Sequence, residues 1–316
     1  MRTIMLSLSY CLIILILSAY IHDVNSMDGG LRAKPGEFPY VASIWYRSHH
    51  ICSGTIIDTL HILTAAHCVQ GKVPTDISVL PGVVDFEKDA REWFGVESYR
   101  QHPSFEIVPL EGWAGQYSRN DIAVLRLQKP LVLSPRVGIA TFWDGKIEAD
   151  GLDDVPHRID AIDAVRADEN NMDTEDDCLD DDSSNDSSSS GSTIGMTALY
   201  KIPGWDYNGG CTKSLYLLWV DSFIYPYKFC VDTGKILFEN QLCASDEDHA
   251  TIAAQGDSGT PVLLDGSVVG IVTGGATQPD GRVPITILRT SPYLDFIAPA
   301  ARAYPQGTPR THGPII

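Results

Sequence analysis

Three short motifs, far apart along the chain, contain the residue types that a nucleophilic serine needs. A Gly-Asp-Ser-Gly motif contains Ser258, a Thr-Ala-Ala-His-Cys motif contains His67, and an Asn-Asp-Ile-Ala-Val-Leu motif contains Asp121. A serine hydroxyl reacts poorly near neutral pH unless an imidazole takes its proton and an acid fixes the tautomer of that imidazole. The motifs therefore predict acyl transfer, with Ser258 as nucleophile, His67 as general base and then general acid, and Asp121 as the orienting carboxylate.

The order of these residues along the chain, His, Asp and then Ser, separates the sequence from two other classes of serine hydrolase. The α/β-hydrolases have the order Ser, acid, His, and the subtilisins have the order Asp, His, Ser. Thr260 also stands where the Gly-x-Ser-x-Gly elbow of lipases has its second glycine. A different fold must therefore position the three residues.

The elements expected to position them are short β-strands. Runs rich in β-branched and apolar residues, separated by turn residues, extend over residues 40–127 and again over about residues 199–287. This pattern is typical of an antiparallel barrel or sandwich. Residues 292–302 are expected to form a short C-terminal helix, with Ser291 as its N-cap and a proline in its first turn.

Together with several further segments, the three motifs resemble the trypsin-like serine proteases, a family with the chymotrypsin fold. Besides the three motifs, the matching segments are residues 28–30, 35–40, 102–103, 204–205, 270–275 and 291–297. The resemblance implies an all-β fold of two six-stranded antiparallel β-barrels with a short C-terminal helix and a catalytic cleft between the barrels. The peptidase domain would occupy residues 27–303, with the first barrel at about residues 27–145 and the second at about residues 194–290.

The resemblance also implies roles for the residues around the nucleophile. The backbone N–H groups of Gly256 and Ser258 would form the oxyanion hole, which stabilises negative charge on the attacked carbonyl oxygen. Asp257 would form an ion pair with the N-terminal amine that activation frees, here that of Met27. The sequence departs from the family at this point, because no Lys or Arg precedes Met27 and an aspartate follows it. The usual tryptic activation cut is therefore not indicated.

The primary specificity pocket is expected to be apolar. The resemblance places Ile252 at its base, where a trypsin has the aspartate that pairs with substrate Lys or Arg. It places Ile285 on the pocket floor, Gly275 at its open mouth, and Thr273 on the strand beside the substrate. A buried carboxylate at Asp121 needs hydrogen-bond donors, and the His67 ring N–H and the Thr273 hydroxyl are the two candidates. Two isoleucines favour an apolar side chain of small or medium size and disfavour an unpaired cation.

The N-terminus and the cysteines predict export. Residues 1–26 are typical of a signal peptide, with an apolar run shorter than the roughly 20 residues of a membrane span; an uncleaved anchor is the alternative. Cys11 would leave with this segment, so that six of the seven cysteines remain for three bridges in an oxidising compartment. The resemblance suggests two pairs and leaves two cysteines for the third, giving Cys52–Cys68, Cys230–Cys243 and Cys178–Cys211.

The formal net charge of −18 argues against nucleic acid and anionic membrane surfaces as partners, because both need a basic patch. Most of this charge lies in residues 148–192, an Asp/Ser-rich insertion with too few apolar residues to fold. A solvated loop is the favoured interpretation, and an acidic arm that binds Ca²⁺ or a partner is the alternative, although no EF-hand spacing is present. Residues 304–316 are expected to form a flexible tail.

The sequence therefore predicts a secreted, extracellular serine endopeptidase that needs no metal and no organic cofactor. Its partners would be protein or peptide substrates, with proteinaceous inhibitors as a further class, and it would not insert stably into a membrane. The competing hypothesis is a catalytically impaired, protease-like binding or regulatory protein, which the altered N-terminus and Ile252 favour. An esterase on the same fold differs only in its leaving group, and the sequence does not separate the two.

Overall fold

The computed structural model describes residues 30–89, 92–109, 117–143, 199–205, 214–225, 227–233, 235–245, 256–274 and 284–302. The expected signal peptide, acidic insertion and C-terminal tail lie outside these residues, as do Met27, Cys178, Cys211, Ile252 and Gly275. Among the helices within the described residues, none is both long and apolar enough to cross a membrane.

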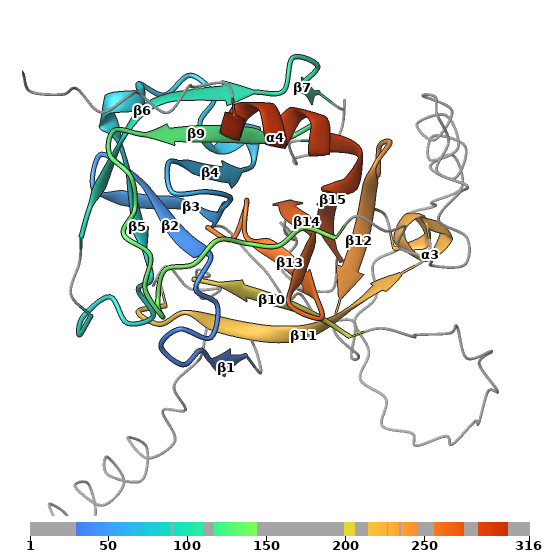
Figure 1. The fold of residues 1–316 in the computed structure, drawn as a ribbon. Helices are drawn as coiled ribbons and strands as arrows, with labels where there is room; N and C mark the ends of the chain where they lie inside the picture. The colour runs from blue at the N-terminus through green and yellow to red at the C-terminus, as the bar shows by residue number, and fades with distance from the viewer. Residues whose placement is uncertain are drawn as a thin grey trace, which may run out of the picture.

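Six antiparallel strands close the first barrel in the order β2-β3-β4-β9-β6-β5 (Figure 1). Their bounds are β2 (Val41–Tyr46), β3 (His49–Ile56), β4 (His61–Thr64), β5 (Ile77–Pro81), β6 (Phe94–Gln101) and β9 (Ala123–Leu127). Ile44, Ile62 and Leu125 belong to the core inside this barrel and are fully buried. Burial of one such side chain stabilises the folded state by about 1.5–3 kcal/mol. This gain favours strands whose apolar side chains all face one interior.

The second barrel also has six antiparallel strands, in the order β11-β10-β13-β14-β15-β12, and a pairing of β11 with β12 closes it. Their bounds are β10 (Tyr200–Gly204), β11 (Leu218–Tyr225), β12 (Gln241–Ser245), β13 (Pro261–Leu264), β14 (Ser267–Gly274) and β15 (Ile285–Arg289). Strand β1 (Leu31–Arg32) adds to the outer edge at β11. The two six-stranded antiparallel barrels expected from the sequence are thus confirmed.

The C-terminal helix joins the two barrels. After a 3₁₀ turn, η5 (Ser291–Tyr293), helix α4 (Leu294–Arg302) lies on the first barrel, near β4 and β9 (Figure 1). One apolar cluster contains Leu63, Ile122 and Val124 of the first barrel, Ile271 and Leu288 of the second, and Tyr293 and Ile297 at the chain's end. The helix was expected at residues 292–302 with Ser291 as N-cap. The structure instead begins with the 3₁₀ turn, whose N-cap is Thr290 and lacks a side-chain cap bond.

Shorter elements connect the barrel strands or lie beside the barrels. Strands β7 (Glu106–Val108) and β8 (Tyr117–Arg119) form a separate two-stranded sheet beside the first barrel. The short 3₁₀ turns η1 (Ala66–Cys68) and η2 (Pro74–Asp76) follow β4, and helix α3 (Tyr227–Asp232) follows β11. Of these, η1 and β8 matter most for function, because they carry or adjoin residues of the candidate site.

Two of the three expected disulfides lie within the described residues, and both are formed. Cys52 of β3 is bonded to Cys68 of η1, and Cys230 of α3 is bonded to Cys243 of β12. Each closes a short loop, with sequence separations of 16 and 13 residues. A bridge across a loop of that length stabilises the fold by about 3 kcal/mol in the chain-entropy model.

Candidate active site

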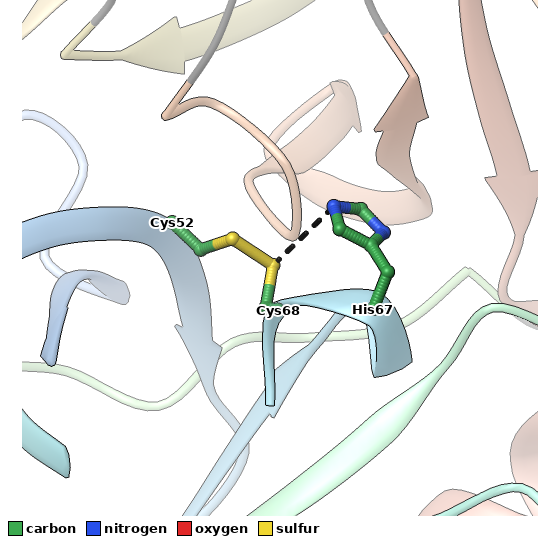
Figure 2. A group of neighbouring side chains, drawn as sticks. All are labelled: Cys52, His67 and Cys68. Atoms are coloured by element: carbon green, nitrogen blue, oxygen red, sulfur yellow. Dashed lines mark hydrogen bonds between the residues drawn. A yellow bond between two sulfur atoms is a disulfide. The ribbon is translucent and has the colours of Figure 1, made fainter. Parts of the chain in front are cut away.

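His67 is held by its neighbours in a short turn at the end of a buried strand. Strand β4 leads into η1, where Cys68 is bonded to Cys52 of the neighbouring strand β3 (Figure 2). Gln101 Nε2 of β6 donates a hydrogen bond of 3.0 Å to the carbonyl oxygen of Ala66. These two attachments fix the backbone on both sides of His67. Its side chain is 30% exposed, so the ring remains accessible from solvent.

The carboxylate of Asp121 is fully buried and faces the His67 ring. Its Oδ2 atom lies 2.6 Å from His67 Nδ1, and its Oδ1 atom accepts a 2.8 Å hydrogen bond from the His67 backbone N–H. An ionised carboxylate can only accept, so this short contact is a hydrogen bond in the tautomer that carries the proton on Nδ1. That tautomer leaves the Nε2 lone pair available to take a proton from a nucleophile.

Ser258 lies in a tight turn before β13, and two glycines shape that turn. Gly256 and Gly259 have φ values of 112° and 86°, in the region that favours glycine. A Cβ at position 259 would collide with the Thr64 side chain and the Ser53 carbonyl oxygen, and it would come within 3.0 Å of the Ala65 nitrogen. The turn of the second barrel therefore packs directly on the strand that leads to His67.

The first barrel also holds this turn through hydrogen bonds from Ser53 of β3. The Ser53 backbone N–H donates to the Ser258 carbonyl oxygen over 2.9 Å, and Ser53 Oγ donates to the Gly256 carbonyl oxygen over 3.1 Å. Cys68 Sγ lies 3.8 Å from the same Ser258 oxygen and 3.7 Å from His67 Nε2. The structure therefore brings all three residues of the predicted triad to one place, at the junction of the barrels.

Cys52, His67 and Cys68 offer atoms of metal-ligand type that all lie within 4.8 Å of one another. Figure 2 shows why this group differs from a metal site, since the two sulfur atoms are bonded to each other. The thiolate is the form of cysteine that binds metals, and a disulfide has none. The group instead serves to anchor the histidine.

Two of the four predicted pocket residues lie within the described residues. Thr273 of β14 is buried, and its hydroxyl donates to the Thr286 carbonyl oxygen over 3.5 Å. The expectation that this hydroxyl donates to Asp121 is therefore wrong. Ile285 of β15 is fully buried in the second-barrel core. Ile252 and Gly275 lie outside the described residues. The pocket roles of these two residues and of Ile285 therefore stay predictions.

Asp257, which directly precedes Ser258, is fully buried. Its predicted partner, the amine of Met27, lies outside the described residues, so their ion pair stays a prediction. The backbone carbonyl of Asp257 accepts a 2.9 Å hydrogen bond from the Thr260 N–H. This bond helps to keep the turn around Ser258 in its tight conformation.

Comparison with known proteins agrees with this geometry. Residues 27–154 and 181–297 match the model of the Trypsin family. The chain belongs to the trypsin family. Among its relatives, the trypsin of Phaedon cochleariae is 24% identical over 286 residues, which cover 87% of this chain and 85% of that protein. Azurocidin of Sus scrofa is 32% identical over 111 residues, or 35% of this chain and 42% of azurocidin.

Several relatives of this trypsin-family chain are matched over only part of their length. The match spans 42% of pig azurocidin and 18% of coagulation factor XII from Bos taurus. Two solved structures are matched over nearly their whole length. A human heparin binding protein is 20% identical with a TM-score of 0.60, over 89% of this chain and 99% of the other. Mouse neuropsin, a serine protease, is 21% identical with a TM-score of 0.60, over 86% and 98%. At these identities the likeness supports the fold.

The sequence motifs of the trypsin family did not indicate every residue that supports the site. Ser118 of β8 donates a 2.8 Å hydrogen bond to Asp121 Oδ2, in the role that Thr273 was expected to fill. Ser53 and Gln101, which hold the turns of Ser258 and His67, were also missed. The one available signal for Ser118 was its position three residues before Asp121 in the chain.

Proposed function

We propose that this protein is a secreted serine endopeptidase that cleaves peptide bonds through an acyl-enzyme at Ser258. The observation that carries the proposal is the buried carboxylate of Asp121, which lies 2.6 Å from His67 Nδ1. A buried charge is costly to the fold, and here it is directed at the nitrogen that must keep its proton if Nε2 is to act as a base. This arrangement is expected in a working site more than in a binding surface.

In the proposed reaction, Ser258 Oγ attacks the substrate carbonyl carbon while His67 Nε2 takes the hydroxyl proton. Asp121 stabilises the imidazolium that forms. The backbone N–H groups of Gly256 and Ser258 donate to the developing oxyanion, and loss of one such donor typically lowers kcat by about 10²–10³. His67 then gives its proton to the leaving amine, and water releases the acyl group by the same steps in reverse. No step needs a metal or an organic cofactor.

The first test is whether Ser258 is a reactive nucleophile. We expect a fluorophosphonate to modify the purified mature protein at Ser258, as mapped by peptide mass spectrometry. Ser258→Ala should abolish labelling and lower peptidase kcat by about 10⁶, the cost of removing the nucleophile in subtilisin. Ser267→Ala, in β14 and away from the site, is the matched control. A folded wild-type protein that never labels would favour the protease-like binding protein instead.

The second proposal concerns specificity, which we infer to be for apolar residues of small or medium size. It is supported by Ile252 in the sequence, because a substrate cation placed against it without a counter-charge would lose several kcal/mol. A peptide library should therefore show cleavage after apolar residues preferred over Lys or Arg by about 100-fold or more. Ile252→Asp should shift the preference toward Lys and Arg. Dominant cleavage after basic residues by the wild type would refute the assignment of this pocket.

The third proposal concerns the mature N-terminus, which we infer to be Met27, freed by signal peptidase or by a non-tryptic protease. It is supported by the buried side chain of Asp257, to which the new amine would bind in a region where an unpaired charge is costly. N-terminal sequencing of the exported, active protein should begin at Met27. A fully active protein that begins at Tyr20 would mean that the oxyanion hole forms without this ion pair.

A further inference from the structure

Within the part of the chain that the structure describes, the carboxylate of Asp121 has one hydrogen-bond donor that is not part of His67. Ser118 Oγ donates over 2.8 Å to Oδ2, the same oxygen atom that lies 2.6 Å from His67 Nδ1. Asp121 is fully buried, and a buried carboxylate needs donors to replace the water that it has lost. The serine hydroxyl therefore compensates part of that loss and restricts rotation of the carboxylate.

Ser118 is itself held from the opposite barrel. Its carbonyl oxygen accepts a 2.8 Å hydrogen bond from Gln241 Nε2, at the start of β12. Gln241 is buried, and its Oε1 atom accepts a 2.9 Å hydrogen bond from the Phe238 N–H, which fixes the orientation of the amide. A path of contacts thus leads from Gln241 in the second barrel through Ser118 and Asp121 to His67 in the first.

The segment between Ser118 and Asp121 has little freedom to move. Asn120 has a φ of 49°, a conformation that asparagine tolerates better than most residues. Its Nδ2 atom donates to the Ser104 carbonyl oxygen over 2.9 Å, and its Oδ1 atom accepts from the Tyr293 hydroxyl over 2.8 Å. The end of β8 is therefore fixed relative to the segment between β6 and β7 on one side and to η5 on the other.

We propose that Ser118 is a positioning residue for the His67–Asp121 pair, and that Gln241 makes this positioning depend on the docking of the second barrel. The inference rests on the proposed peptidase function, because orientation of Asp121 has a kinetic consequence only where His67 acts as a base. Ser118 acts through Asp121 and touches no reacting atom. The second barrel, which carries Ser258, thereby also fixes the orientation of Asp121. Asp121 in turn orients His67, the proposed base.

The test compares Ser118→Ala, Ser118→Thr and Ser118→Val in the full-length mature enzyme. Active sites are counted with a fluorophosphonate, and kcat and KM are measured per counted site with one peptide substrate. We expect kcat to fall about tenfold or more in the Ala and Val variants, because each loses a hydrogen bond to a charged group, while KM stays within about twofold. Thr keeps a hydroxyl and should restore kcat. Val matches Thr in shape, so that this pair isolates the hydroxyl.

Ser104→Ala is the matched control, because Ser104 is exposed and contacts Asn120 through its backbone carbonyl. It should leave kcat unchanged. Gln241→Met tests the second half of the proposal, since it removes the donor to Ser118 with little change in size. It should lower kcat in the same direction, and in combination with Ser118→Ala it should lower kcat no further than Ser118→Ala alone.

An unchanged kcat per counted site in both the Ala and Val variants would overturn the role of Ser118, and so would a Thr variant as slow as Val. Independent, additive effects would overturn the link to Gln241. If Ser118→Ala does not fold, the Thr and Val pair decides. A wild-type enzyme that the fluorophosphonate does not label would refute the peptidase function and this inference together. A labelled wild type with insensitive Ser118 variants would refute the inference alone.

Discussion

A single carboxylate without access to water, that of Asp121, is the constraint on which the structure of the site depends. A buried charge that loses its partners destabilises a protein by about 3–5 kcal/mol, so the fold must supply donors at fixed positions. The donors come from η1, which carries His67, and from β8, which carries Ser118. The positions of η1 and of the end of β8 are therefore tied to one buried acid.

The second requirement is that Ser258, the proposed nucleophile carried by the other barrel, meets this pair. The turn of Ser258 is held against the first barrel by Ser53, and its close packing there leaves no room for a side chain at position 259. On the far side of the junction, α4 returns from the second barrel to pack on the first. The site is therefore complete only when the two barrels are docked on each other. Separation of the barrels would part Ser258 from His67, the proposed nucleophile from its proposed base.

Much of this architecture could be predicted from the sequence, because it follows from local patterns. Runs rich in β-branched and apolar residues, separated by turn residues, indicated the strands, and cysteine spacing within the family resemblance indicated both disulfides that the described residues contain. The motifs around His67, Asp121 and Ser258 indicated the proposed triad. These features depend on residue types at fixed offsets. Such offsets can be recognised in the sequence without knowledge of how distant segments pack.

The contacts that were missed depend on packing between segments distant in the chain. Of the two candidate donors to Asp121, the His67 ring lies at the carboxylate, but the hydroxyl of Thr273 instead donates to Thr286 of the neighbouring strand β15. Ser118 takes that role because the sheet of β7 and β8 is fixed by contacts with Gln241, which lies 123 residues further along the chain. The residues near Ser118 in the sequence do not indicate its hydrogen bond with Gln241. The choice between two hydroxyls is made by tertiary structure.

In the proposed mechanism, buried Asp121 keeps a proton on His67 Nδ1, which leaves Nε2 free to act as a base. Proton NMR of the mature protein with ¹⁵N-labelled histidine tests this most directly. We expect a strongly downfield Nδ1 proton, slow to exchange at neutral pH, that persists in Ser258→Ala and disappears in a folded Asp121→Asn variant. Absence of this resonance in the folded wild type, or its survival in Asp121→Asn, would show that Asp121 does not hold the proton on Nδ1.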